Sequence, residues 1–244
     1  MSTLTHVRAD LGARRKVRSF ERFLNRHTDS LTRRFGPSEA AIMRREMLEE
    51  YRALIPQVPY IGGRRNPWNA NLAGAPMALA GYRVVLRHGG SAQDAGEMVR
   101  AYAQRQVERI PRRLRPLLRP RPSRAQKVAR WTQQRRYPDD WVAEFVDGTG
   151  QPFDFGLDVT ECAIVKFMHA QGADEFTPWL CHLDYVMAEA AGYGLTRTKT
   201  LAWGCDRCDF RMTANGATTA TWPPDFPERT CGQSGTPGST GSTS

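Results

Sequence analysis

Cysteine is the residue type whose spacing most suggests chemistry in this chain. Cys162, Cys181, Cys205 and Cys208 lie close together in the sequence, and a fifth cysteine, Cys231, follows them. A cysteine acts as a nucleophile or a metal ligand in its thiolate form. The basic N-terminus lacks the apolar stretch of a secretory signal. We therefore expect these cysteines to be reduced, catalytic or metal-bound rather than a disulfide framework.

Cys205 and Cys208 form a Cys-x-x-Cys pair that allows three interpretations. A structural zinc site normally has a second cysteine or histidine pair, so here Cys162 and Cys181 would have to complete it from two separate helices. A thioredoxin-like redox pair begins a helix after a strand, whereas this pair lies at a predicted β-turn. The third interpretation makes the pair part of a hydrolytic active site.

Three consecutive predicted elements each present a cysteine beside charged side chains. The groups are Cys162, Lys166 and His169 on one helix, with Glu161 adjacent; Cys181, Asp184 and Tyr185 on a second helix; and Arg197, Cys208, Asp209 and Arg211 on a hairpin. Helical residues three or four positions apart share a face. Lys166, one turn after Cys162, could favour the thiolate. The alternative for each cysteine is a small buried hydrophobic residue.

The second half of the chain has the pattern of an antiparallel sheet with two helices. The predicted elements are strands 141–146 and 152–159, helices 160–172 and 177–191, and strands 195–203 and 208–213. Asp147 and Gly148 between the first two strands are a strong hairpin signal. Thr160 is the expected cap of the first helix. This order predicts an α+β fold.

The first half of the chain has the apolar periodicity of helices. The predicted helices cover residues 16–35, 37–55 and 75–87, and a further helix is capped by Ser91. Residues 56–74 are rich in Pro, Gly and Asn, and residues 110–124 are rich in Pro, so both read as irregular connectors.

These patterns predict a helical N-terminal half packed on a small antiparallel sheet. We divide the chain into a basic helical extension (1–36), a helical region (37–122), an α+β catalytic region with the cysteine motifs (123–215) and an irregular, disordered tail (216–244). The tail is rich in Gly, Ser and Thr, a composition that cannot form a packed core.

Charge is distributed unevenly along the chain. Residues 1–136 hold 29 Lys and Arg against 10 Asp and Glu, whereas the remainder holds 6 against 15. Such a basic half could attract a polyanion, but it contains no recognised nucleic-acid motif. We interpret it as a solvated helical surface and do not expect nucleic acid as a partner. No run of about 18 apolar residues suggests a membrane span, so we expect a cytoplasmic protein.

Three stretches of the second half resemble the L-2-amino-thiazoline-4-carboxylic acid hydrolase family. They are TECAIVKF (160–167), GADEFTPWLCHLDY (172–185) and GYGLTRTKTLAWGCDRCDFRM (192–212). The loop VPYIGGRRNPWN (58–69) fits more loosely. The family motifs fall on Glu161, Cys162, Cys181, Asp184, Cys208, Asp209 and Arg211, and they leave out Cys205.

The resemblance implies hydrolytic opening of a 2-aminothiazoline ring to an N-carbamoyl-cysteine. The reacting ring carbon belongs to an isothiourea, whose cationic form needs a carboxylate partner, and the ring carboxylate needs a cation. Our hypothesis makes Cys162 or Cys181 the nucleophile or a thiol base partner. Asp184 and Glu161 would hold the amidinium and move protons.

The remaining candidate residues would support this reaction. Cys208 is a further catalytic candidate, Lys166 would activate the thiolate, and Arg197 would bind the substrate carboxylate through two hydrogen bonds. The other substrate-binding candidates are Asp209, Arg211 and Asn69, with Asn66 and Asn71 beside the last. We expect a small-molecule substrate, for example in a biosynthetic pathway, and no metal or other cofactor. A homo-oligomer is compatible with this hypothesis.

A non-catalytic alternative uses the same cysteines. The stretch ending in CDFRM is also similar to the small-molecule-binding domain named after vinyl reductases. A sensor module of that kind could bind a ligand, with or without a cysteine-bound zinc, and perform no turnover. Stoichiometric zinc in the purified protein would favour this alternative.

Overall fold

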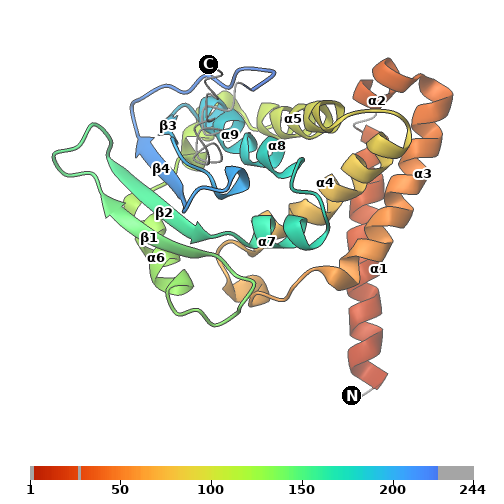
Figure 1. Cartoon of the computed structure of the whole chain (residues 1–244), viewed down its shortest axis with the longest axis horizontal. Coiled ribbons are helices and arrows are strands. Elements are labelled where there is room, and N and C mark those ends of the chain that lie inside the picture. Colours follow the sequence, from red (N-terminus) through yellow and green to blue (C-terminus); the bar gives the residue numbers. More distant parts are fainter. Residues whose placement is uncertain (1–2, 27–28, 225–244) are drawn as a thin grey trace, which may run out of the picture.

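The computed structural model describes residues 3–26 and 29–224, which form helices around a four-stranded antiparallel sheet (Figure 1). The α-helices of the first half are α1 (Thr3–Arg26), α2 (Asp29–Phe35), α3 (Pro37–Leu54), α4 (Asn69–Arg87), α5 (Ala92–Glu108) and α6 (Pro122–Thr132). The second half adds α7 (Ala163–Ala170), α8 (Thr177–Cys181) and α9 (Leu183–Ala191). The strands are β1 (Val142–Asp147), β2 (Phe155–Glu161), β3 (Gly194–Thr196) and β4 (Cys208–Thr213).

Short 3₁₀ helices fill several connections between these elements. They are η1 (Ile55–Gln57), η2 (Gly63–Arg65), η3 (Arg112–Leu118) and η4 (Leu201–Trp203). Together with the antiparallel sheet, the helices confirm the predicted α+β fold class.

The last strand occupies an inner position of the sheet, whose order is β1-β2-β4-β3. In the register of β2 with β4, Cys208 lies opposite Val159. Because β2 continues only to Glu161, this register brings Cys208 close to the start of α7, where Cys162 lies. Strand pairing therefore joins two cysteines that are far apart in the sequence.

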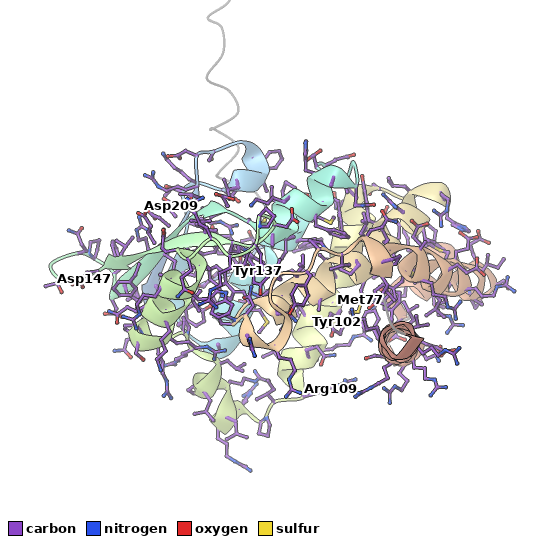
Figure 2. All side chains as sticks on the ribbon, turned by 90° about the horizontal axis from the view of Figure 1, so that it is seen from below. Met77, Tyr102, Arg109, Tyr137, Asp147 and Asp209 are labelled. Atoms are coloured by element: carbon purple, nitrogen blue, oxygen red, sulfur yellow. The ribbon has the colours of Figure 1, made fainter. Side chains whose placement is uncertain are left out.

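Some helices pack directly on the sheet, and others pack only on further helices. Helix α6 packs on β1, α7 packs on α4, and α4 is flanked by α3 and α5. Helix α1 lies against α3 on the side farthest from the sheet (Figure 1). In Figure 2, Asp147 marks the tip of the β1–β2 hairpin at the opposite end of the molecule from α1. One hydrophobic core extends from Phe20 of α1 to Met212 of β4.

The start of α7 differs from the prediction. Strand β2 continues through Glu161, which pairs with Val142 of β1, so Thr160 belongs to the strand and does not cap the helix. The N-cap residue is Cys162, with extended backbone angles. Strand pairing has overridden the capping preference of threonine. The predicted single helix over 177–191 is also interrupted at His182, which separates α8 from α9.

Three predicted boundaries in the connections are wrong. Helix α4 begins at Asn69, inside the stretch 56–74 that was predicted to be a loop. The connector 110–124 contains η3 and the start of α6, where Pro122 occupies a position suited to the first helical turn. The predicted strand 195–203 is reduced to β3.

Asp209 explains why β3 is short. Its carboxylate accepts the backbone N–H groups of Thr198 and Lys199, at 2.8 and 2.6 Å. These side-chain bonds occupy backbone donors that a longer strand would use in its ladder, so regular pairing ends at Thr196. Residues 216–224 form no helix or strand, although Trp222 packs on Trp179, and residues 225–244 of the predicted tail lie outside the described residues. No helix of the described part is long and apolar enough to cross a bilayer.

Candidate functional site

Three free thiols come together from three different elements. Cys162 caps α7, Cys181 is the last residue of α8, and Cys208 is the first residue of β4. The thiols lie close enough for the charge of one to oppose the ionisation of another. Cys205 is instead disulfide-bonded, which corrects the expectation that it is reduced. In this state the Cys-x-x-Cys sequence offers one thiol, that of Cys208.

The thiol of Cys162 is buried beside hydrogen-bond donors near the start of α7. Burial raises the pKa of its thiol to about 11. The backbone N–H groups of Val165 and Ile164 and the indole N–H of Trp141 act in the opposite direction, because they favour the thiolate. The thiol makes no side-chain capping bond at the start of α7. At neutral pH Cys162 is therefore protonated, with donors beside it that would stabilise a negative charge.

The other two thiols are also protonated at rest. Burial raises the pKa of Cys181 well above its ordinary value, and it raises the pKa of Cys208. The guanidinium of Arg197 lowers both pKa values, but burial outweighs it. The Cys208 sulfur accepts the backbone N–H of Leu201 and bonds the hydroxyl of Thr200, each at 3.3 Å. Cys208 is a buried residue whose sulfur is hydrogen-bonded, whereas the residues Cys162 and Cys181 are partly exposed although their thiols are buried.

Arg197 forms a fixed cationic centre behind these thiols. Its side chain is 3% exposed, and its Nη1 donates to Oδ2 of Asp184 at 3.0 Å. Its Nη2 donates to the carbonyl of Cys181 at 3.3 Å. The guanidinium also lies over the rings of Tyr185 and Phe210, 5.1 and 5.2 Å from their centroids. Such a side chain orients Asp184, and binding a substrate carboxylate would require it to leave these partners.

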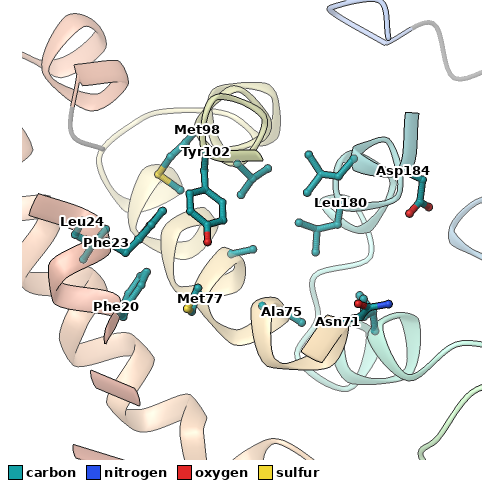
Figure 3. A pocket seen from close by; sticks show the side chains of 15 residues that line it. Phe20, Phe23, Leu24, Asn71, Ala75, Met77, Met98, Tyr102, Leu180 and Asp184 are labelled. Carbon is teal, nitrogen blue, oxygen red and sulfur yellow. The ribbon is translucent and has the colours of Figure 1, made fainter. Parts of the chain in front are cut away.

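A pocket of about 300 Å³ is lined by neighbours of the cysteines in the chain, although none of the three free cysteines is itself part of the lining. Asn71 of α4 and Asp184 of α9 lie at one end, and Phe20, Phe23 and Leu24 of α1 lie at the other (Figure 3). Met77 of α4 and Met98 and Tyr102 of α5 line the space between them (Figure 3). Ile164 and Leu180, which are next to or near Cys162 and Cys181 in the chain, also line the pocket. The pocket is therefore large enough for a small molecule, and residues close to Cys162 and Cys181 in the chain form part of its wall.

Glu161 and Lys166 pair with each other at the surface. Lys166 also donates to the carbonyls of Pro138 and Asp140, at 2.7 and 3.2 Å, and Glu161 accepts from Arg135 at 2.6 Å. Hydrogen bonding by Lys166 is the main cause that lowers the pKa of Glu161. The ammonium group is therefore occupied by oxygen atoms, and the pKa of Cys162 is set by other groups.

Asp209 and Arg211 face away from Cys208, because alternate residues of a strand point to opposite faces. Asp209 holds the Thr198–Lys199 turn, and Arg211 pairs with Asp158 of β2 at 2.7 Å. The same alternation puts Phe210 on the side of Cys208, where it contacts Arg197. Asp209 and Arg211, which fall on the motifs of the resemblance, therefore hold neighbouring segments of the sheet together beside the site.

The other sequence candidates lie at the margins of the site. His169 is exposed and pairs with Asp174 at 2.9 Å. Asn69 begins α4 without lining the pocket, whereas Asn71 lines it. Asn66 is buried and donates to the carbonyl of Ile61 and to Asp140, at 2.7 and 2.8 Å.

Sequence reasoning missed residues that shape the site by long-range packing. Trp141, which faces the thiol of Cys162, was assigned only to a strand. Phe20 and Phe23 were assigned to a basic extension. The apolar spacing of α1 was visible in the sequence, but the sequence did not show which residues its apolar face would contact. Among the described residues, no three His, Cys, Asp or Glu side chains are grouped so that they could hold a metal ion.

Comparison with known proteins gives one match. The family model described as L-2-amino-thiazoline-4-carboxylic acid hydrolase matches residues 71–212. This region contains the three free cysteines, Asp184 and Arg197, and it leaves α1, α2 and α3 outside. No curated protein and no solved structure matches the chain.

Proposed function

Because the chain belongs to the L-2-amino-thiazoline-4-carboxylic acid hydrolase family, we propose that it hydrolyses a small cyclic isothiourea of the 2-aminothiazoline type. The observation that carries the proposal is the meeting of three protonated thiols with the Arg197–Asp184 pair beside a pocket. An isothiourea is basic and becomes an amidinium on protonation. Asp184 lines the pocket and offers the carboxylate that such a cation requires.

Cys162 is the proposed nucleophile. Cys162 is partly exposed as a residue although its thiol is buried, and the N–H groups near the start of α7 and the Trp141 indole favour a negative sulfur. Cys208 is less suited, because it is buried and its sulfur bonds Thr200 and Leu201. Cys181 is also less suited, because burial raises the pKa of its thiol well above the ordinary value, whereas hydrogen-bond donors act against burial at Cys162.

The substrate itself is the proposed base that activates Cys162. A thiol with a pKa of about 11 is protonated when the neutral ring arrives. The proton moves from the sulfur of Cys162 to the ring nitrogen, which creates a thiolate beside an amidinium that Asp184 holds. The thiolate then forms a bond to the carbon between nitrogen and sulfur. The ring C–S bond breaks, and the ring sulfur leaves as a thiolate.

Water completes the reaction. After the first step, an isothiouronium group joins the substrate carbon to the sulfur of Cys162. A water oxygen bonds to this carbon, and the sulfur of Cys162 leaves with its bonding electrons. The two protons of the water pass to the two thiolates, that of Cys162 and that of the opened ring. The product is a carbamoyl compound with a free thiol, and the net change is the addition of one water molecule. The donors around Cys162 would stabilise its sulfur as the leaving group.

Arg197 acts as a positioning residue in this proposal. It touches Asp184 and the carbonyl of Cys181, and it thereby fixes α8 and α9 relative to each other. A lysine at this position would keep the charge but could not make both bonds in the same planar geometry. The role of Arg197 is to keep the Asp184 carboxylate aimed at the substrate.

Single serine substitutions at the three thiols test the proposal. L-2-amino-thiazoline-4-carboxylate and its carboxylate-free parent serve as substrates, and the new thiol is measured with a chromogenic disulfide after the protein is removed. We expect Cys162→Ser to lower kcat by about 10³-fold or more, with an unchanged thermal unfolding midpoint. Acid-quenched wild-type protein should carry the substrate mass on Cys162.

The same series separates the alternatives. Cys208→Ser is the matched control, and it should retain ring opening because the serine hydroxyl can keep the bond to Thr200. Loss of activity in Cys181→Ser together with retained activity in Cys162→Ser would reassign the nucleophile. Binding of both compounds without any ring opening would reject hydrolysis and favour a non-catalytic binding module.

A further inference from the structure

The charge of the pocket lining does not match the substrate acid after which the family is named. Asp184 is the one charged residue among the described residues that line the pocket, and Asn71 and Tyr102 are the polar ones beside it. A carboxylate placed here would meet no lysine, arginine or histidine of this lining. Arg197, the cation held by Asp184, is 3% exposed. An anionic ligand would therefore lose hydration without gaining a cationic partner in this lining.

The aromatic end of the pocket is built by a helix outside the family match. Phe20, Phe23 and Leu24 belong to α1, whereas the match begins at residue 71. The ring of Phe23 meets Tyr102 of α5 edge to face, with centroids 4.4 Å apart. Phe23 also stacks on Phe20, with centroids 5.6 Å apart. In Figure 3 Phe20 and Phe23 lie at the opposite end of the pocket from Asn71 and Asp184. They form a surface suited to an apolar or aromatic group.

The volume also exceeds what a small ring acid needs. The pocket of about 300 Å³ is at the lower limit for drug-sized ligands, about 300–1,000 Å³. A ring that occupies only the end near Asn71 and Asp184 would leave the space between Met77, Met98 and Phe23 empty. Apolar space of this kind contributes to binding only when an apolar group fills it.

From these observations we infer that the substrate is a cyclic isothiourea with an apolar substituent in place of the ring carboxylate. Its cationic head would lie at Asp184, and its substituent would lie against Phe23 and Tyr102. This inference rests on the proposed function. It makes α1 a specificity-determining element, because the helix supplies the surface that selects the substituent.

Two compounds that differ in one substituent test the inference. They are 2-amino-thiazolines that carry either a phenyl group or a carboxylate on ring carbon 4. We expect wild-type kcat/KM to favour the phenyl compound by about tenfold or more, the range that a filled apolar pocket provides. Binding of both compounds is measured in parallel by calorimetry on Cys162→Ala protein, so that affinity is read without turnover.

A charge placed at the aromatic end should reverse the preference. Phe23 is only partly buried, so Phe23→Arg can carry its cation toward the pocket and should favour the carboxylate compound. Leu117→Arg, at a residue 66% exposed on η3 and absent from the pocket lining, is the matched control for added charge. Thermal unfolding of each variant checks that it folds. An unfolded Phe23→Arg protein is replaced by Phe23→Leu, which should weaken only the phenyl compound.

The outcomes distinguish this inference from the proposed function. A wild-type preference for the carboxylate compound, or a preference unaffected by Phe23, would overturn the inference and leave hydrolysis standing. Phe23-dependent binding of the phenyl compound without ring opening would uphold the ligand class and reject hydrolysis. No binding and no turnover of either compound would overturn both.

Discussion

The two ends of the pocket differ in how their side chains are held. At the thiol end, Asp184 of the pocket lining is bonded to Arg197, and Cys208, which lies outside the lining, is bonded to Thr200 and Leu201. At the aromatic end, Phe20, Phe23 and Tyr102 are held by ring packing. Directional bonds fix atoms in place, as catalysis requires, whereas ring packing tolerates changes of shape. The first end lies within the family match and the second draws on α1, which lies outside it.

The largest expected effect concerns ionisation at the thiol end. Since burial raises the pKa of Cys162 to about 11, its alkylation by iodoacetamide should accelerate about tenfold per pH unit from pH 7 to pH 10, because only the thiolate reacts. Peptide mass spectrometry at short reaction times measures the rate at each cysteine. A plateau at Cys162 below pH 9 would contradict a protonated resting state.

The same raised pKa affects stability with a definite sign. The folded thiol holds its proton more tightly than the unfolded thiol does, whose pKa is the ordinary 9.0. The contribution to folding is therefore complete below pH 9 and is lost as the pH rises toward 11. The alkylation series must be accompanied by circular dichroism, so that loss of fold above pH 9 is not read as reactivity.

The next largest effect compares substitutions at the two ends of the pocket. Asp184→Asn removes the charge that would hold the amidinium, and we expect kcat/KM to fall by about 10²-fold or more. The asparagine oxygen can still accept from Arg197, so the unfolding midpoint should change little. Phe23→Leu is the matched substitution at the aromatic end, and it should leave kcat for the carboxylate-free ring within about twofold. Equal losses in the two variants would remove the distinction between the ends.

The smallest expected effect concerns Lys166. Its ammonium bonds Glu161 and the carbonyls of Pro138 and Asp140, so Lys166→Met should leave kcat within about twofold of wild type. The partly exposed pair should contribute about 0.5 kcal/mol to the free energy of unfolding. Steady-state kinetics and urea titration measure the two quantities. A loss of about tenfold or more in kcat would restore Lys166 as an activator of the thiolate.

The elements near the site were predictable to different degrees. The hairpin of β1 and β2 and the turn-bounded helices follow from local patterns, which is why the α+β order was correct. The start of α7 was misplaced because pairing of β2 with β1 decided whether Thr160 capped a helix. Asp209 and Arg211 face away from Cys208. Predicting what they contact there required the register of β4 against β2, which depends on contacts between distant segments.

The role of α1 was the least predictable feature. Arginine is frequent in α1, and its few apolar residues predicted an amphipathic helix. They did not predict which element its apolar face packs against. Only the packing of α1 on α3 brings Phe20 and Phe23 beside α5. Local periodicity identifies a face that will be buried, but the partner of that face is a property of the whole fold.

Three thiols in one cluster would ordinarily be vulnerable to peroxide, because a thiolate is oxidised stepwise to sulfenic, sulfinic and sulfonic acids. Here burial raises the pKa of all three and keeps them in the slowly reacting form. If the substrate supplies the base, Cys162 becomes reactive only while the pocket is occupied. The protein would then expose its nucleophile to the intended electrophile and withhold it from oxidants in the surrounding solvent.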